Sequence, residues 1–105
     1  MHPVRRFITW WVQRVVVEGD SMLPTLRSGD EVLAVRRWRR PRVGDLVLCP
    51  DPRDMARTLV KRCHEITGDQ VVLRGDNPEY STDSRHFGPV PRATIRYFVV
   101  PLHRH

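Results

Sequence analysis

The stretch Val17–Val35, V-E-G-D-S-M-L-P-T-L-R-S-G-D-E-V-L-A-V, sets the organisation of the chain. An apolar run ends at Val17, and a turn that carries Ser21 follows. Gly29-Asp30 then opens a second apolar run, Glu31–Val35. A serine on a bend between two strands exposes its hydroxyl and its own backbone N–H, the groups that a nucleophile and an oxyanion donor require. We therefore expect the rest of the chain to position and activate Ser21.

The composition indicates one small globular domain. The chain has 105 residues, of which 40% are hydrophobic and 29% charged, enough for one modest core. Nine prolines and six glycines favour many short strands over long helices. We predict a mostly β fold, a single small antiparallel β domain over residues 1–105. Residues 1–11 are expected to form a short N-terminal helix or extended segment, and residues 101–105 a frayed tail.

Arginine dominates the basic residues. The formal net charge is +6 and the pI about 10.6, which is the electrostatic footprint of proteins that bind polyanions. Lysine occurs once, at Lys61. Because arginine stays protonated in proteins, Lys61 is the single side-chain amine that can serve as a general base.

The strand pattern places Lys61 among apolar neighbours. Strands are expected over Val12–Val17, Glu31–Arg36, Leu46–Cys49, Thr58–Ile66, Gln70–Arg74 and Ile95–Val100, with Pro50–Arg57 as an exposed loop and Thr67-Gly68-Asp69 as a hairpin turn. A period of two puts Leu59, Lys61 and Cys63 on one face of their strand. Burial against such neighbours lowers the pKa of an amine, and a drop of about 2–3 units makes a usable base near neutral pH.

The segment Arg36–Arg42 places arginines around Trp38 and a proline. Basic residues interleaved with an aromatic side chain suit nucleic-acid binding. The same pattern suits a solvated loop in which Trp38 covers an edge of the core. The residues alone leave both interpretations open, and we favour the loop.

Other catalytic arrangements fit less well. His64 is predicted to face away from Lys61, and His86 lies in a polar segment. Cys63 and His64 are adjacent in a strand, so their side chains point to opposite faces. Cys49 and Cys63 are too few for a disulfide scaffold and lack the spacing of a metal site. A single bridge between them is possible, and we favour buried free thiols. We predict no metal and no cofactor.

Four motifs resemble those of the type I signal peptidases and follow the same order. The nucleophile box is matched by G-D-S-M-L-P-T-L at Gly19–Leu26 with G-D-E-V-L at Gly29–Leu33. The next two boxes are matched by V-G-D-L-V at Val43–Val47 and V-K-R at Val60–Arg62. The last is matched by G-D-N-P-E-Y-S-T-D-S-R-H-F-G-P-V-P at Gly75–Pro91, a segment polar enough in its first part to form a buried brace.

The resemblance implies a Ser–Lys dyad. Ser21 would be the nucleophile, with its backbone N–H as oxyanion donor, and Lys61 the general base. Ser81 would bind the lysine amine and orient it. Some relatives donate to the oxyanion from a serine two positions before the nucleophile, where this chain has Gly19. Losing a donor of this kind costs about 2.7–4 kcal/mol, so a backbone or water donor must replace it.

The resemblance also implies two ion pairs that brace the site. Asp76 would pair with Arg62, and Asp83 with Arg85.

Substrate binding is expected to follow strand addition, in which an extended peptide pairs with an exposed strand edge beside the serine. We predict that the walls of this site include Val15 and Val17 on the strand before the serine, and Met22 and Pro24 after it. The family suggests small side chains just before the cleaved bond.

Two departures from the family narrow the prediction. We expect no transmembrane helix before the serine, and only Arg62–Arg74 stands where many members carry a large β insertion. A catalytic core without the membrane helix and the β insertion most resembles the nickel-type superoxide dismutase maturation proteases. We therefore predict a serine endopeptidase that removes an N-terminal propeptide or leader, with nickel superoxide dismutase as the precursor. The predicted location is cytoplasmic, with peripheral membrane contact through Phe7, Trp10 and Trp11 as a further option.

Three alternatives remain. The first is a membrane-associated signal peptidase that acts on secretory precursors. The second is a self-cleaving SOS-type repressor, which lacks the last motif. The third is a basic β module that binds nucleic acid through Arg36–Arg42, which leaves the polar segment unexplained, so no nucleic acid is expected as a partner.

Overall fold

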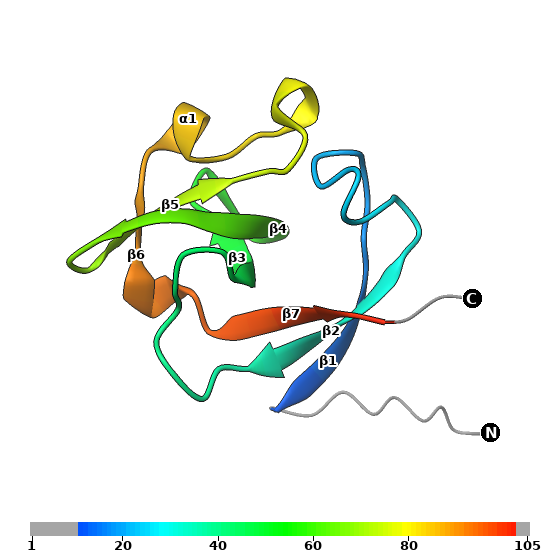
Figure 1. Ribbon diagram of the computed structural model, residues 1–105, viewed down its shortest axis with the longest axis horizontal. Helices are drawn as coiled ribbons and strands as arrows, with labels where there is room; N and C mark the ends of the chain where they lie inside the picture. The colour runs from blue at the N-terminus through cyan, green and yellow to red at the C-terminus, as the bar shows by residue number, and fades with distance from the viewer. Residues whose placement is uncertain (1–10, 103–105) are drawn as a thin grey trace.

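The computed structural model describes residues 11–102 (Figure 1). In chain order its elements are β1 Val12–Val16, β2 Glu31–Arg36, β3 Leu46–Asp51, β4 Asp54–Thr67, β5 Gln70–Arg74, the 3-10 turn η1 Pro78–Tyr80, α1 Ser84–Phe87, β6 Val90–Pro91, the 3-10 turn η2 Arg92–Thr94 and β7 Tyr97–Pro101. None of the helices within residues 11–102 is long and apolar enough to cross a membrane. The prediction of a mostly β domain is confirmed.

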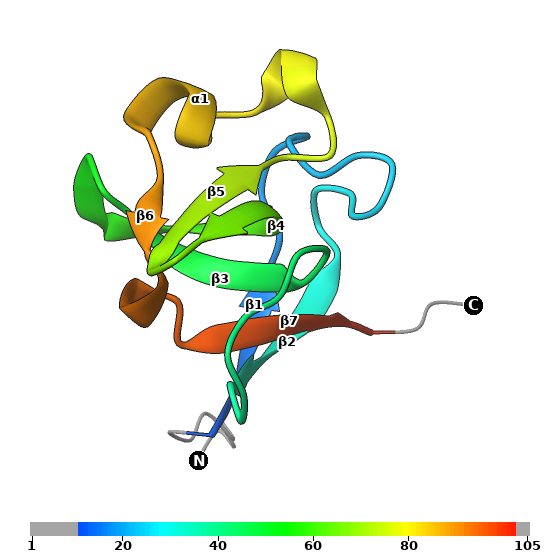
Figure 2. The same cartoon turned by 60° about the vertical axis from the view of Figure 1, so that its left-hand side comes forward.

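The strands form one antiparallel sheet in the order β1-β2-β7-β3-β4-β5-β6. β7 pairs with β2 over five residue pairs, but with β3 only through Val47–Phe98 and Leu48–Tyr97. The sheet bends at this short seam. Figures 1 and 2 show the result: β3, β4 and β5 lie together at one side, and β1, β2 and β7 run beneath them at the other.

The core has two parts, one in each half of the bent sheet. The first gathers around β3, β4 and β5 and includes Val47, Cys49, Cys63, Leu73, Ile95 and Phe98. The second joins β2 to the loop before it and includes Met22, Leu26, Val32, Ala34, Leu48 and Val99. Strand alternation explains the second part, because Val32 and Ala34 are buried on one face of β2. Met22 and Leu26 then fix the serine-bearing loop onto that face.

The hairpin between β3 and β4 differs from the prediction. An exposed loop over Pro50–Arg57 is wrong, because β3 continues to Asp51 and β4 begins at Asp54. Asp51 is buried and accepts hydrogen bonds from the Arg53 N–H at 2.9 Å and from its guanidinium, which closes a tight turn. The register shifts between Pro50 and Asp51, which is where a sheet tolerates proline.

Other strand ends shift by a few residues. β7 begins at Tyr97 rather than Ile95, because η2 comes first and Ile95 packs into the core. β1 ends at Val16 rather than Val17. The predicted N-terminal segment, with Phe7 and Trp10, and the last three residues lie outside the described range, while Trp11 is 63% exposed.

The arginine-rich loop is anchored to the edge of the core. Arg39 binds both carboxylate oxygens of Asp45, at 2.9 and 3.1 Å, and its guanidinium lies 4.6 Å from the centre of the Phe98 ring. Trp38 contacts the same ring edge-on, with 4.9 Å between ring centres. These contacts favour the interpretation of the segment as a solvated loop in which Trp38, 68% exposed, covers an edge of the core.

Candidate active site

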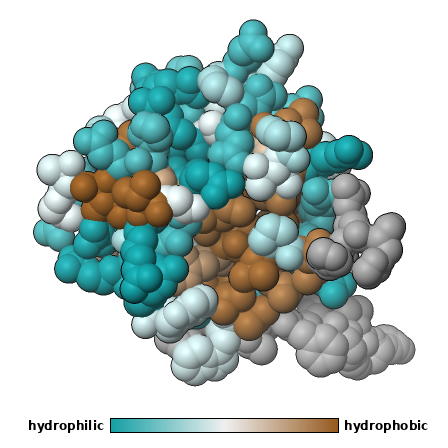
Figure 3. Space-filling view, viewed as in Figure 1, coloured by the Kyte–Doolittle hydropathy of each residue, from teal (hydrophilic) through white to brown (hydrophobic). Residues whose placement is uncertain are grey.

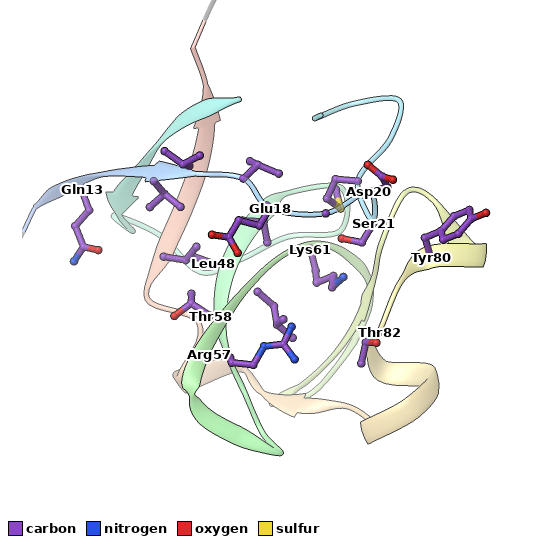
Figure 4. A pocket seen from close by; sticks show the side chains of 17 residues that line it. Gln13, Glu18, Asp20, Ser21, Leu48, Arg57, Thr58, Lys61, Tyr80 and Thr82 are labelled. Atoms are coloured by element: carbon purple, nitrogen blue, oxygen red, sulfur yellow. The ribbon is translucent and has the colours of Figure 1, made fainter. Parts of the chain in front are cut away.

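A groove of about 550 Å³ runs between β1, the loop that follows it, and β4. We call residues 17–30 the serine loop. Figure 3 shows apolar side chains gathered on this face around β1, with hydrophilic side chains above them. Ser21 and Lys61 both line the groove, and Figure 4 shows their polar ends directed into it.

The serine loop is closed at its base and held by its own turns. The Val17 N–H donates to the Asp30 carbonyl and the Gly29 N–H to the Val17 carbonyl, both at 2.8 Å. Within residues 11–102, the Ser21 N–H donates to no other group. That N–H is therefore available to an oxyanion. Gly19, which lacks a side-chain donor, has φ of +83°, a backbone conformation that favours glycine.

Lys61 is a buried amine. It follows the predicted alternation of β4, since Leu59, Lys61 and Cys63 are buried while Val60 and Arg62 are partly exposed. Its exposed fraction is 2%. Burial lowers the pKa of Lys61, and Arg85 and Arg57 add to that effect. Asp83 and Asp51 act in the opposite direction without cancelling it.

A chain of hydrogen bonds leads away from the amine. Lys61 Nζ donates to Ser81 Oγ at 3.1 Å, and Ser81 Oγ donates to Asp83 Oδ2 at 2.8 Å. Burial by itself would raise the pKa of Asp83, but hydrogen bonds from Arg85, the Gly75 N–H and Ser81 lower it far below its ordinary value. Asp83 therefore stays ionised and keeps the Ser81 hydroxyl pointed at itself, so the amine meets an oxygen lone pair.

A second set of contacts ties the last motif to the serine loop. Asp76 accepts two hydrogen bonds from Arg62, at 3.0 and 2.8 Å, and one from the Thr25 hydroxyl. The Asn77 N–H donates to the Ser21 carbonyl at 2.8 Å, and its side-chain amide donates to the Asp20 carbonyl at 3.0 Å. These bonds fix the backbone around Ser21.

Gly75 lets the three segments approach one another. A Cβ atom at this position would lie 2.1 Å from Ser81 Oγ and 2.7 Å from the Ser21 carbonyl oxygen. Sequence reasoning did not assign roles to Gly75, Thr25 or the side chain of Asn77. A glycine directly after a strand is a signal of close backbone approach, and it could have pointed to Gly75.

The predicted substrate-binding residues divide into two groups. Val15, Val17 and Met22 line the groove, although Met22 and Val17 are largely buried in the core beneath it. Pro24 is exposed and lies outside the groove lining, after a cis peptide bond with Leu23. Residues that the sequence did not single out also line the groove, among them Gln13, Glu18, Arg57, Thr58, Tyr80 and Thr82.

The other candidate groups lie elsewhere. His64 is exposed on the opposite face of β4, and His86 accepts a hydrogen bond from the Asp83 N–H at 3.3 Å. Cys49 and Cys63 are free and buried. Burial raises the pKa of Cys49 to about 11 and that of Cys63 to about 12, so neither thiol forms a nucleophilic thiolate near neutral pH.

Comparisons with known proteins identify relatives of this arrangement. The family model described as signal peptidase, peptidase S26, matches residues 4–77. A mitochondrial ATP-independent inner membrane protease subunit 1a of Arabidopsis thaliana is 36% identical, over 90% of this chain and 70% of that protein. The mitochondrial inner membrane protease subunit 1 of Schizosaccharomyces pombe is 30% identical, over 95% of this chain and 76% of that protein. The mitochondrial inner membrane protease subunit 1 of Mus musculus is 31% identical, over 78% of this chain and 63% of that protein.

These relatives correct one prediction. A cytoplasmic location is wrong, because the similar proteins are subunits of inner membrane proteases, which points to association with a membrane. None of these three relatives is a nickel superoxide dismutase maturation protease.

Proposed function

Because the chain belongs to the signal peptidase family, peptidase S26, we propose that it is a serine endopeptidase that removes N-terminal leaders with a Ser21–Lys61 dyad. One observation carries the dyad assignment. The single lysine of the chain is buried, bound to Ser81, and directed into the groove that Ser21 also lines. A buried amine of lowered pKa is a base suited to a serine nucleophile.

The chemistry begins with the neutral amine of Lys61. It accepts the proton of the Ser21 hydroxyl while Ser21 Oγ attacks the carbonyl carbon of the substrate. The oxyanion that forms accepts a hydrogen bond from the Ser21 N–H. Lys61 then passes the proton to the leaving amine, which frees the C-terminal product. A water molecule, deprotonated by Lys61, attacks the acyl-enzyme, and Ser21 regains its proton as the N-terminal fragment leaves.

Ser81 serves this cycle as a positioning residue. It accepts one N–H of the amine, which leaves the lone pair of Lys61 free to face Ser21. Asp83 fixes the direction of the Ser81 hydroxyl, and Arg85 keeps Asp83 ionised. Asp76 and Arg62 hold the serine loop in register with β4.

We further propose that the substrates are precursors presented at a membrane. The relatives named as inner membrane protease subunits support the membrane-associated alternative over nickel superoxide dismutase maturation. The groove accepts an extended peptide, because one of its walls is β1, the edge strand of the sheet.

The sharpest test of the dyad is Lys61→Arg, which keeps the positive charge and removes the base. We expect no cleavage of a leader peptide by Lys61→Arg or by Ser21→Ala, with unchanged circular dichroism for both. Cleavage by Lys61→Arg at the wild-type rate would rule out the dyad.

Two precursors distinguish the substrate classes. The full chain is incubated with liposome-bound secretory precursor and, separately, with a nickel superoxide dismutase precursor, and each new N-terminus is read by mass spectrometry. We expect a new terminus on the secretory precursor alone, and none with Ser21→Ala. Cleavage of the dismutase precursor alone would reverse the substrate assignment.

A further inference from the structure

Two opposite charges face the groove from different walls. Glu18 follows β1 at the start of the serine loop, and Arg57 lies near the start of β4. Both residues are exposed, and Figure 4 shows both side chains within the groove. The groove lining also includes the charged residues Asp20 and Lys61 and the apolar residues Val15, Leu48 and Val60. A charge in such a setting is a strong discriminator of what binds there.

Arg57 differs from the other arginines around the site in having no partner. Arg62 and Arg85 each bind a carboxylate with two hydrogen bonds. Arg53 binds Asp51, the acid whose pKa Arg57 also helps to lower. Within residues 11–102, the guanidinium of Arg57 forms neither a hydrogen bond nor an ion pair. Its five donors are free for a ligand.

The position of Arg57 on β4 fixes which part of a substrate it meets. It precedes Lys61 by four residues on β4, and both residues line the same groove. Four residues of strand span about 13 Å, and an extended peptide covers that length in about four residues. A peptide cleaved beside Lys61 therefore brings a side chain three to five residues from the cleaved bond to Arg57.

We propose that Arg57 is a specificity-determining residue that binds an acidic side chain of the substrate, three to five residues from the cleaved bond. A planar guanidinium receives a carboxylate through two parallel hydrogen bonds, which gives the contact direction as well as charge complementarity. The proposal rests on the proposed peptidase function. It adds a preference for an acidic side chain at the end of the groove where Arg57 lies.

The test uses paired peptides built on a leader that the wild-type chain cleaves. Each position from five residues before to five after the cleaved bond carries Glu in one peptide and Gln in its twin. We expect Glu to raise kcat/KM about threefold to tenfold at one position in the stated interval. Arg57→Gln should abolish that ratio, and Arg57→Glu should favour Lys there. Arg96→Gln, an exposed arginine outside the groove with the same change in charge, should keep it.

Binding to chains that also carry Ser21→Ala separates this proposal from the peptidase assignment. Fluorescent versions of the Glu and Gln peptides should bind the Ser21→Ala variant with the same preference for Glu. The double variant Ser21→Ala, Arg57→Gln should bind the two peptides equally. Equal binding of the twins at every position, or a preference that survives Arg57→Gln, would overturn the role of Arg57. Absence of cleavage with the Glu preference in binding intact would instead overturn the peptidase assignment.

Discussion

At the scale of single residues, Ser81 holds the amine and is itself held. It accepts from Lys61 and donates to Asp83, and it is buried with both. The rest of the amine is directed into the groove that Ser21 also lines. Orientation of this kind acts on the chemical step rather than on binding of the peptide.

Ser81→Ala tests this orienting role. The variant should lower kcat about tenfold to a hundredfold, a fraction of what a general base contributes, with KM nearly unchanged. Steady-state kinetics on a leader peptide measures both constants. An unchanged kcat would contradict the role of Ser81 in orienting Lys61. A rise in KM alone would show that Ser81 contributes to binding of the peptide instead.

The pH dependence follows from the buried lysine. Lys61 must be neutral to accept a proton, so kcat/KM should rise with pH through the pKa of Lys61. Because burial lowers that pKa, the rising limb of the pH profile should lie below pH 10.5. Asp83 and Asp51 raise the pKa of Lys61, while Arg85 and Arg57 lower it. Arg57→Gln should therefore move the limb to higher pH, measured with a peptide that lacks acidic residues. Arg96→Gln is the matched control, and a limb that moves to lower pH would contradict the sign.

The sequence predicted the burial of Lys61 better than the contacts around it. The period of β4 was sufficient to place Lys61 on a buried face. The position of Arg57 in the groove could not be read, because it lies in the stretch that two prolines marked as a loop. The bonds of Thr25 and Asn77 depend on how the serine loop and the turn after β5 meet, and spacing along the chain carries no such information.

At the scale of elements, the turn after β5 holds the serine loop through Asp76. The Arg62–Asp76 pair is partly shielded, with side-chain exposures of 34% and 18%. The Arg40–Asp69 pair is open to solvent, with 70% and 85%. The two pairs therefore form an internal comparison between a bracing contact and a surface contact.

Asp76→Asn should lower the free energy of unfolding by about 1–2 kcal/mol, while Asp69→Asn should change it by less than about 0.5 kcal/mol. The hydrogen bonds from Arg62 lower the pKa of Asp76 below 3.8. The contribution of Asp76 to the free energy of unfolding is therefore complete above pH 3.8 and is lost as the pH falls through the lowered pKa. Urea denaturation at pH 7 and at pH 3 measures both effects. Equal losses in the two variants would show that the brace is worth no more than a surface pair.

Gly75→Ala tests the close approach of three segments. The added methyl group would meet Ser81 and the Ser21 carbonyl, so the turn after β5 must move away. We expect a loss of about 1–3 kcal/mol in stability and a larger proportional loss of activity. Thermal unfolding and peptide cleavage measure the two. Full activity in a chain of unchanged stability would show that the backbone yields at no cost.

Elements were predicted well where a pattern was local. β2 and β5 have the predicted bounds because each alternates cleanly between turns. β7 starts late because η2 takes up the chain before it, and the strand order depends on the long-range seam with β3. Neither feature leaves a local mark in the sequence.

At the scale of the whole molecule, the two thiols report on the integrity of the core. Cys49 and Cys63 should resist iodoacetamide at pH 8 in the native chain, because burial raises their pKa values to about 11 and about 12. Both should react fully in urea. Mass spectrometry counts the adducts, and cleavage assays should show no inhibition. Native labelling of either thiol would mean that the core opens more readily than its packing indicates.

Residues 75–85 form hydrogen bonds to both Ser21 and Lys61, so the proposed active site is complete only when this segment is in place. Synthesis starts at the N-terminus, so Ser21 leaves the ribosome first, followed by Lys61 and last by residues 75–85. A nascent chain thus carries a serine without a working partner. In the proposed mechanism, cleavage therefore begins only after residues 75–85 have been made and have bound Ser21 and Lys61.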